Sequence, residues 1–576
     1  MFLVISLLVI HLGQLPAKAV EETPEIEKVY CNATLEDDFT EDEIIIVVNP
    51  EWNEQEYTEN DFTSINCSMV EEIADSEGEG VLSRILMLTI ADGTKQKVLD
   101  AIKVLEQRED VHSAEPNYLE MMEGTYVSTN TSPNTSTGDV QYADAAMNMD
   151  SSPENPMWPV EVIDLEEARE IQNPGNTVYV GVIDSGIDLG HPSLMLSVDC
   201  EKSKSFVYNK KTHELLSPIS DVSGHGTHVA GIITCRNSAD TAGVCANVKL
   251  VSLRVWEDDD STASIATITE AIEYAESVGL QILNYSGGGY GSPEKLKSIE
   301  SRRVAIANFP GLVVCSAGND DNNNDTKQHY PSGHRLPNLI AVGASTENDT
   351  KWDDSNYGQT TVDIFAPGEN ILSCFPMNLC GGTYCGYPGH VSHGYHYMSG
   401  TSMAAPFVTG VAALLLSENP NLTPAQIKAK IMVDCDKIPA FANYCVSGGR
   451  LNAYKALLGV NTYTVITCEF SIVEELGDGE YHWYKFESPE NGWYKFYSQY
   501  TQSYLDVKGE LFYVIVPAGS TQDRIDFSDD LYEPDDGNDP DRNFELFLEM
   551  DKGDTVYIRV SAYDAGSYQF LVYKWK

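Results

Sequence analysis

Positively charged residues are scarce in this chain of 576 residues: 36 Lys and Arg stand against 88 Asp and Glu, a formal net charge of −52. Nucleic acid and anionic membranes repel such a polyanion, so we expect neither as a partner. General disorder is excluded, because hydrophobic residues make up 42% of the chain and charged residues 22%, as in globular proteins. The charge is typical of a protein kept soluble in a salty or acidic medium.

Long hydrophobic runs are also lacking after the N-terminus, so no membrane-spanning segment is predicted. The first residues, MFLVISLLVIHLGQLPAKA, form a short apolar run that ends in an A-x-A cleavage pattern. Residues 1–19 are therefore interpreted as a signal peptide, although no Lys or Arg precedes the run. A signal peptide predicts a secreted, extracellular protein.

The 12 cysteines show no zinc-binding spacing with nearby histidines. Structural disulfides in an oxidising compartment are favoured instead, which agrees with export. Some cysteines are close neighbours in the sequence, such as Cys235 and Cys245 or Cys435 and Cys445. Spacing alone leaves their pairing open.

The chain is too long for one core, and its pattern changes at several points. Residues 20–123 predict a small α+β unit, with strands at 44–48, 84–90 and 111–119 and a helix at 95–106. Residues 124–154 are rich in Ser, Thr, Asn and Pro and predict a linker. In residues 155–460, short apolar strands alternate with helices, which predicts an α/β domain whose parallel sheet is flanked by helices. Residues 461–576 carry short alternating aromatic runs, which predict an all-β sandwich.

Four residues in the α/β region have the chemistry that peptide hydrolysis needs. Asp184 follows an apolar strand, His225 lies in Gly-His-Gly-Thr-His, and Ser402 lies in Gly-Thr-Ser-Met-Ala-Ala-Pro before an apolar helix. Asn319 follows another strand in Ser-Ala-Gly-Asn. A hydroxyl at a helix N-terminus, a base, an acid that orients the base and an amide donor form a nucleophilic site.

Each of these residues also has an ordinary structural explanation. Asp184 alone fits a turn or helix cap, Ser402 an N-cap, and Asn319 a turn after glycine. A metal site at His225 and His228 is disfavoured, because their spacing lacks the intervening Glu of zinc peptidases. His228 is expected to be a packed histidine near the site.

Taken together, the three segments around Asp184, His225 and Ser402 resemble the signature blocks of the subtilisin-like serine proteases (peptidase S8), in the subtilisin and proteinase K branch. The order Asp, His, Ser along the chain is the order of that family. The resemblance implies a catalytic triad of these three residues, an oxyanion hole that includes Asn319, and substrate backbone binding by Ser286, Gly287 and Gly288. It covers residues 155–460.

The resemblance extends in weaker form to both flanks. Residues 20–123 look like the family's inhibitory propeptide, and residues 461–576 look like a pre-peptidase C-terminal β-sandwich. The implied protein is a monomeric, secreted serine endopeptidase, made as a self-inhibited zymogen, that cleaves proteins or peptides through an acyl-enzyme and uses no organic cofactor. A kexin-like processing protease and a secreted binding protein on an inactive protease scaffold are the alternatives.

Two regions depart from the pattern or leave a question open. Phe407 stands where the family usually has His, and residues 374–396 look like an insertion with three cysteines and three histidines that could narrow the cleft. A disulfide-pinned loop is favoured there over a metal site. Calcium is a possible cofactor at the acidic runs 320–325 and 535–539, for which solvated loops are the simpler interpretation.

Overall fold

The computed structural model describes most of the chain from residue 28 to residue 458 and the strands that follow it. The gaps in the first part are 76–83, 123–154, 172–174, 209–214, 236–242, 257–261, 291–298, 380–389 and 393. The later described segments are 463–467, 470–476, 481–500, 512–516, 545–550, 555–561 and 566–574. The predicted signal peptide, the predicted linker and the acidic run 535–539 lie outside the described residues.

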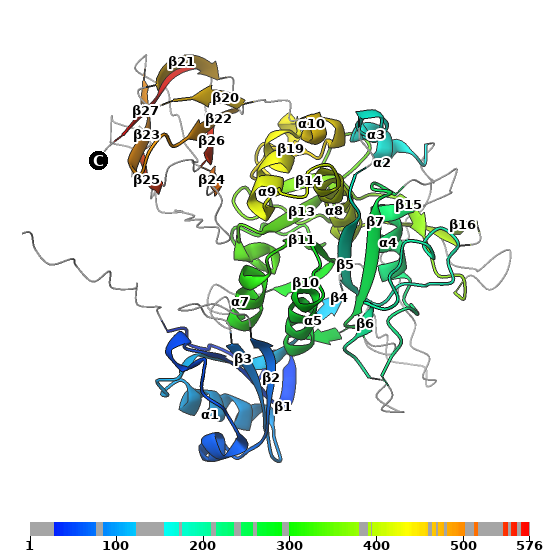
Figure 1. The fold of residues 1–576 in the computed structure, drawn as a ribbon, viewed down its shortest axis with the longest axis vertical. Coiled ribbons are helices and arrows are strands. Elements are labelled where there is room, and N and C mark those ends of the chain that lie inside the picture. The colour runs from blue at the N-terminus through cyan, green and yellow to red at the C-terminus, as the bar shows by residue number, and fades with distance from the viewer. Residues whose placement is uncertain are drawn as a thin grey trace, which may run out of the picture.

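A nine-stranded sheet forms the centre of the α/β domain (Figure 1). Its strands, in spatial order, are β18 (Asp436–Lys437), β19 (Gly449–Arg450), β14 (Ile364–Pro367), β13 (Leu339–Ser345), β11 (Leu312–Ser316), β9 (Ile282–Tyr285), β5 (Val178–Asp184), β7 (Val248–Arg254) and β6 (Lys204–Ser205). All neighbours are parallel except β18 and β19. The predicted parallel sheet is confirmed, since apolar strands of this kind must be covered on both faces.

Helices cover both faces of this sheet. One face carries α4 (His225–Thr234), α8 (Thr401–Glu418), α9 (Pro424–Val433) and α10 (Ala453–Leu458), with α2 (Trp158–Val162) and α3 (Leu165–Ile171) at its edge. The other face carries α5 (Ile265–Ser277) and α7 (Glu300–Asn308). Helix α8 is long and apolar enough to cross a membrane, but 94% of it is buried within the protein. It is therefore a core helix.

The N-terminal unit is an antiparallel sheet with one helix on its outer face. It contains β1 (Phe39–Val48), β2 (Cys67–Asp75), β3 (Arg84–Ile90), α1 (Lys95–Leu105) and β4 (Val111–Met122), with 3₁₀ turns at Pro50–Trp52 and Glu59–Ile65. Ile44 and Ile46 of β1 pack toward α1, whereas Ile45 and Val47 pack with residues of α5 and α7. The alternation of side chains along a strand thus joins this unit to the α/β domain through a second core.

Strand β4 extends beyond its own unit. It lies antiparallel between β8 (Thr262–Ser264) and β10 (Gly287–Tyr290), and β10 continues to β12 (His329–Tyr330). Figure 1 shows β4 next to β10, at the border of the two units. The end of the N-terminal unit is therefore a strand of a sheet that the α/β domain completes.

The C-terminal region contains two four-stranded sheets, as an all-β sandwich requires. One sheet has the order β20 (Tyr463–Ile466), β22 (Tyr481–Glu487), β26 (Thr555–Ser561) and β24 (Phe512–Val516). The other has the order β21 (Phe470–Leu476), β27 (Gly566–Lys574), β23 (Gly492–Tyr500) and β25 (Glu545–Met550). Phe486 and Phe496, one from each sheet, meet edge to face between them. Sheet packing thus explains these aromatic side chains.

Candidate active site

Asp184 and His225 form the centre of the candidate site. Asp184 ends β5, and His225 begins α4, so the sheet supplies one side chain and a helix the other. Nδ1 of His225 lies 2.9 and 3.0 Å from the two carboxylate oxygens of Asp184. Both side chains are fully buried. This contact fixes the ring so that Nδ1 carries the proton and Nε2 faces away from the carboxylate.

Asp221 holds the turn that leads into His225, and the sequence analysis missed it. Its Oδ2 accepts the amide N–H and the hydroxyl of Thr227 at 2.9 and 2.7 Å, and its Oδ1 accepts the amide of Gly224 at 2.8 Å. Ser185 bridges the two acids, with its hydroxyl 3.1 Å from Asp184 and 3.0 Å from Asp221. Burial raises the pKa of Asp221 against the effect of these donors. An acid four residues before His225, ahead of a glycine-rich helix start, was the signal available in the sequence.

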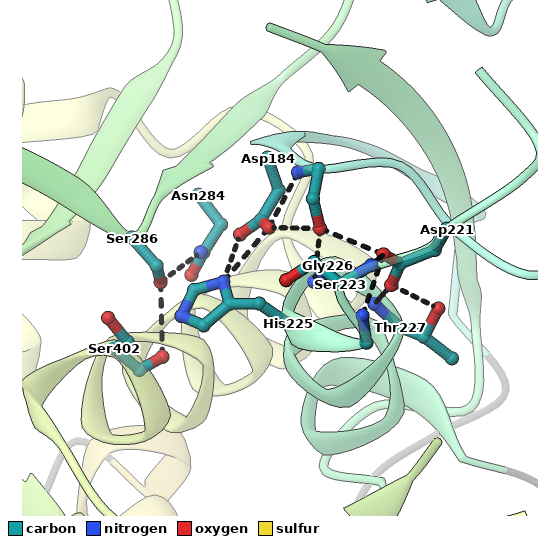
Figure 2. Close-up of polar contacts among 11 residues, drawn as sticks. Asp184, Asp221, Ser223, His225, Gly226, Thr227, Asn284, Ser286 and Ser402 are labelled. Atoms are coloured by element: carbon teal, nitrogen blue, oxygen red, sulfur yellow. Dashed lines mark hydrogen bonds and ion pairs between the residues drawn. The ribbon is translucent and has the colours of Figure 1, made fainter. Parts of the chain in front are cut away.

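Ser402 lies in the first turn of α8, whose N-cap is Gly400. Its carbonyl accepts the Ser286 hydroxyl at 3.1 Å, and Asn284 donates to that same hydroxyl at 2.9 Å. Thr409, further along α8, donates to Asn284 at 2.8 Å. Figure 2 shows the imidazole of His225 between the carboxylate of Asp184 and Ser402. The structure therefore brings the three predicted residues together.

Asn319 follows Gly318, whose φ of +105° turns the chain after β11. Its Oδ1 accepts the amide and the hydroxyl of Thr401 at 2.8 and 2.9 Å, which fixes the orientation of the side-chain amide. A Cβ built on Gly400 would lie 3.5 Å from Nδ2 of Asn319 and 3.7 Å from the backbone nitrogen of Ser402. Oδ1 of Asn319 lies 3.6 Å from the same point, so the side-chain amide of Asn319 and the backbone nitrogen of Ser402 lie close together, and both groups can donate to an oxyanion beside them.

The segment predicted to bind substrate backbone is paired with the N-terminal unit. Gly287 lies opposite Met122 and Gly288 opposite Met121 in the β10–β4 pair. Ser286 precedes them and contacts Ser402 as described above. A Cβ on Gly288 would collide with the carbonyl of Tyr330, so glycine is required at this position. The strand that should receive substrate is thus occupied by β4.

His228 has the packing role expected of it. Its Nε2 lies 3.0 Å from the carbonyls of Ile371 and His396. Burial lowers the pKa of His228 to about 3, with smaller contributions from His396 and His225. It is therefore a neutral histidine that links α4 to the neighbouring hairpin.

The predicted insertion, residues 374–396, contains β16 (His390–Ser392) and connects β15 (Ile371–Cys374) to β17 (Tyr395–Met398), and the three strands form one sheet. Phe375, the residue after β15, packs against Gly224, which directly precedes His225. A Cβ on Gly224 would collide with the Phe375 ring. His396 stacks on that ring at 4.9 Å. In the described part of the chain, no three His, Cys, Asp or Glu side chains converge on a possible metal site.

The acidic run 320–325 bonds to protein groups. Asp325 accepts the hydroxyls of Thr360 and Thr361 at 2.8 and 2.7 Å, and Asp321 pairs with Lys351 at 2.8 Å. Side chains that already bond to neighbours do not converge as calcium ligands. The residues of this run therefore do not fit a calcium site, and Asp325 and Asp321 bond to protein groups where a solvated loop was the alternative expectation.

Comparison with known proteins supports the family that the sequence motifs of the α/β domain resemble. The model of the subtilase family, Peptidase S8, matches residues 175–447. Subtilisin of Bacillus pumilus is 35% identical over 260 residues, which cover 45% of this chain and 83% of that protein. Thermitase of Thermoactinomyces vulgaris is 32% identical over 286 residues, 49% of this chain and 89% of that protein.

The chain belongs to the subtilase family. Subtilisin NAT of Bacillus subtilis subsp. natto is also 35% identical, and the match covers 60% of its length. The crystal structure of fervidolysin from Fervidobacterium pennivorans, a keratinolytic enzyme related to subtilisin, superimposes with a TM-score of 0.55. That match covers 83% of this chain and 68% of fervidolysin at 22% identity, so it bears on the fold alone.

Proposed function

We propose that this protein is a secreted serine endopeptidase, made as a self-inhibited zymogen, with Asp184, His225 and Ser402 as its catalytic triad. The observation that carries the proposal is the buried Asp184–His225 pair with Ser402 on the other side of the ring (Figure 2). Asp184 ends a core strand, whereas His225 and Ser402 lie at the starts of two core helices, and packing of the core does not require these three side chains to meet. Membership of the subtilase family supports the same reaction class.

In the proposed mechanism His225 accepts the proton of the Ser402 hydroxyl as that oxygen attacks the scissile carbonyl. Asp184 holds the imidazole tautomer and stabilises the imidazolium that forms. Asn319 and the Ser402 amide donate to the oxyanion, and His225 then protonates the leaving amine. His225 then accepts a proton from water as the water attacks the acyl-enzyme, and it returns that proton to the Ser402 oxygen as the acid product leaves.

The N-terminal unit acts as the inhibitor in this proposal. Strand β4 occupies the edges of β8 and β10, where an extended peptide substrate would add its own backbone hydrogen bonds. In this proposal residues 20–123 are the propeptide, and cleavage after β4 would free these edges.

A disulfide between Cys235 and Cys374 would agree with export, because disulfides form in oxidising compartments. The two side chains contact each other, and this contact lowers the pKa of the Cys235 thiol. A disulfide here would join the end of α4 to β15 beside the insertion. Peptide mapping of the secreted protein without reduction should find a Cys235–Cys374 linked pair, and two alkylatable thiols would argue against it.

The test of the function compares wild type with Ser402→Ala by intact mass and by labelling with a fluorophosphonate probe. Wild type should lose its N-terminal segment and take the label at Ser402, and the variant should do neither. If the wild type is neither cut nor labelled although it is folded, the alternative of an inactive scaffold that binds a partner is favoured. A strict requirement for paired basic residues in a peptide library would favour the kexin-like alternative.

A further inference from the structure

A buried ion pair crosses the border between the propeptide and the α/β domain. Glu120 of β4 is 6% exposed and pairs with the guanidinium of Arg302, which is fully buried. The Tyr285 hydroxyl donates to Oε2 of Glu120 at 2.7 Å. One carboxylate thus contacts two polar groups of the α/β domain inside a site closed to solvent.

Glu120 occupies a substrate-like position. Its backbone lies opposite Ala263 of β8, and the next two residues of β4 lie opposite Gly288 and Gly287 of β10. Because the strands are antiparallel, β4 runs toward Ser286, which contacts Ser402. In a substrate bound in this register, the residue opposite Ser286 lies next to the nucleophile. If the peptide bond after the residue opposite Ser286 is cut, that residue is P1. The residue in the place of Glu120 lies three positions before it and is therefore P4.

The surroundings of Arg302 favour an anion. Arg302 lies in the first turn of α7, where the helix dipole adds positive potential. Burial and the charge of Arg302 hold the pKa of His334 well below its usual range, so His334 is neutral. Glu300, the acid at the start of α7, is held by Arg303 at 2.7 Å. Among the described residues, the acids that interact with Arg302 are Glu120 and, more weakly, Glu115, and both belong to the propeptide.

Removal of the propeptide therefore leaves Arg302 in the α/β domain and takes away both Glu120 and Glu115. Water can solvate Arg302 while the edge is empty, but a bound peptide displaces that water. An apolar side chain in the place of Glu120 would leave a buried charge without a counterion, which is among the costliest arrangements in a protein. A carboxylate restores both the ion pair and the hydrogen bond from Tyr285.

We propose that Arg302 and the Tyr285 hydroxyl form a subsite that selects an acidic substrate side chain at the position of Glu120. This inference rests on the proposed function, since it requires that substrates bind along β8 and β10 as β4 does. The substrates are then proteins with Glu or Asp three residues before the residue that faces Ser286.

Internally quenched peptides built on residues 117–126 test the proposal with the self-processed full-length enzyme. Four peptides differ only at the position of Glu120, with Glu, Gln, Leu or Lys. We expect kcat/KM for the Glu peptide to exceed the values for Gln and Leu by about tenfold or more, with Lys lowest. In Arg302→Leu the ratio of Glu to Gln should fall to about one, and in Tyr285→Phe it should fall in part. Arg303→Gln, one residue away, should keep the wild-type ratio.

A second measurement needs no variant. On wild type, the ratio of Glu to Gln should fall as the peptide carboxyl protonates in acid, because the Gln peptide corrects for the pH dependence of catalysis itself. Equal cleavage of the Glu, Gln and Leu peptides by wild type would overturn the subsite and leave the proposed function standing. Failure of cleavage together with failure of fluorophosphonate labelling would instead count against the proposed function.

Discussion

Thr227 donates both its amide N–H and its hydroxyl to one carboxylate oxygen of Asp221, at 2.9 and 2.7 Å. This contact satisfies the first turn of α4, in which His225 is the first residue. We expect Asp221→Ala to lower the free energy of unfolding by about 1–3 kcal/mol, because several buried donors lose their acceptor. Denaturant unfolding in the Ser402→Ala background, which prevents self-digestion, measures this. Thr227→Val removes the hydroxyl, which donates to Asp221 and accepts the Asp188 amide, but keeps the other donors to Asp221. It should cost less than Asp221→Ala, and an equal or larger loss would contradict this account.

Asn319 should matter for rate rather than binding. Asn319→Ala removes a donor to the oxyanion, so kcat should fall on the order of a hundredfold or more with KM little changed. Thr401→Val removes one of the two donors that orient the amide, and its kcat should lie between that of Asn319→Ala and wild type. Steady-state kinetics on a single peptide separate the two parameters. A rise in KM at constant kcat in Asn319→Ala would exclude the oxyanion role.

Propeptide binding should weaken as the pH rises toward neutrality. Glu270 of α5 lies at the interface, where burial, together with Glu71 and Glu43 of the propeptide, raises its pKa to about 7. A carboxyl with a raised pKa in the complex stabilises that complex fully below its ordinary pKa of 4.5, and this contribution is lost as the pH rises through about 7. The complex should therefore be on the order of tenfold tighter at pH 5 than at pH 8.

Size-exclusion chromatography of the self-processed enzyme at several pH values shows how much cleaved propeptide is retained. Glu270→Gln should flatten the pH dependence by keeping the propeptide bound at pH 8. Glu161→Gln, an exposed change on α2, is the charge-matched control. Retention in Glu270→Gln that follows the wild-type pH curve would show that other groups control release.

Gly224 should not tolerate a side chain. Its φ is +91°, and a Cβ would collide with the ring of Phe375 from the insertion hairpin. We expect Gly224→Ala to lose most activity, because the next residue is His225 and the shift would move the imidazole. Phe375→Ala combined with Gly224→Ala removes the collision and should recover part of the activity in a peptide assay. An unimpaired Gly224→Ala single variant would refute the tight contact.

Much of the fold was predictable because its signals are local. The strand ending at Asp184 and the helix that begins next to Ser402 both appear where the sequence predicts them. Strand β2 was missed: it is an edge strand, most of its side chains are not buried, and its polar sequence shows no clear alternation. The boundaries of the flanking units remain predictions.

The sequence by itself determined the order of elements and the segments that carry Asp184, His225, Ser402 and Asn319, because each is a short motif next to its own strand or helix. Tertiary structure alone decided which distant groups meet. Glu120 meets Arg302, and Ser185 contacts Asp221, because folding buries both members of each pair in one place. The free energy of a buried charge depends on its neighbours in space, and separation along the chain carries no information about them.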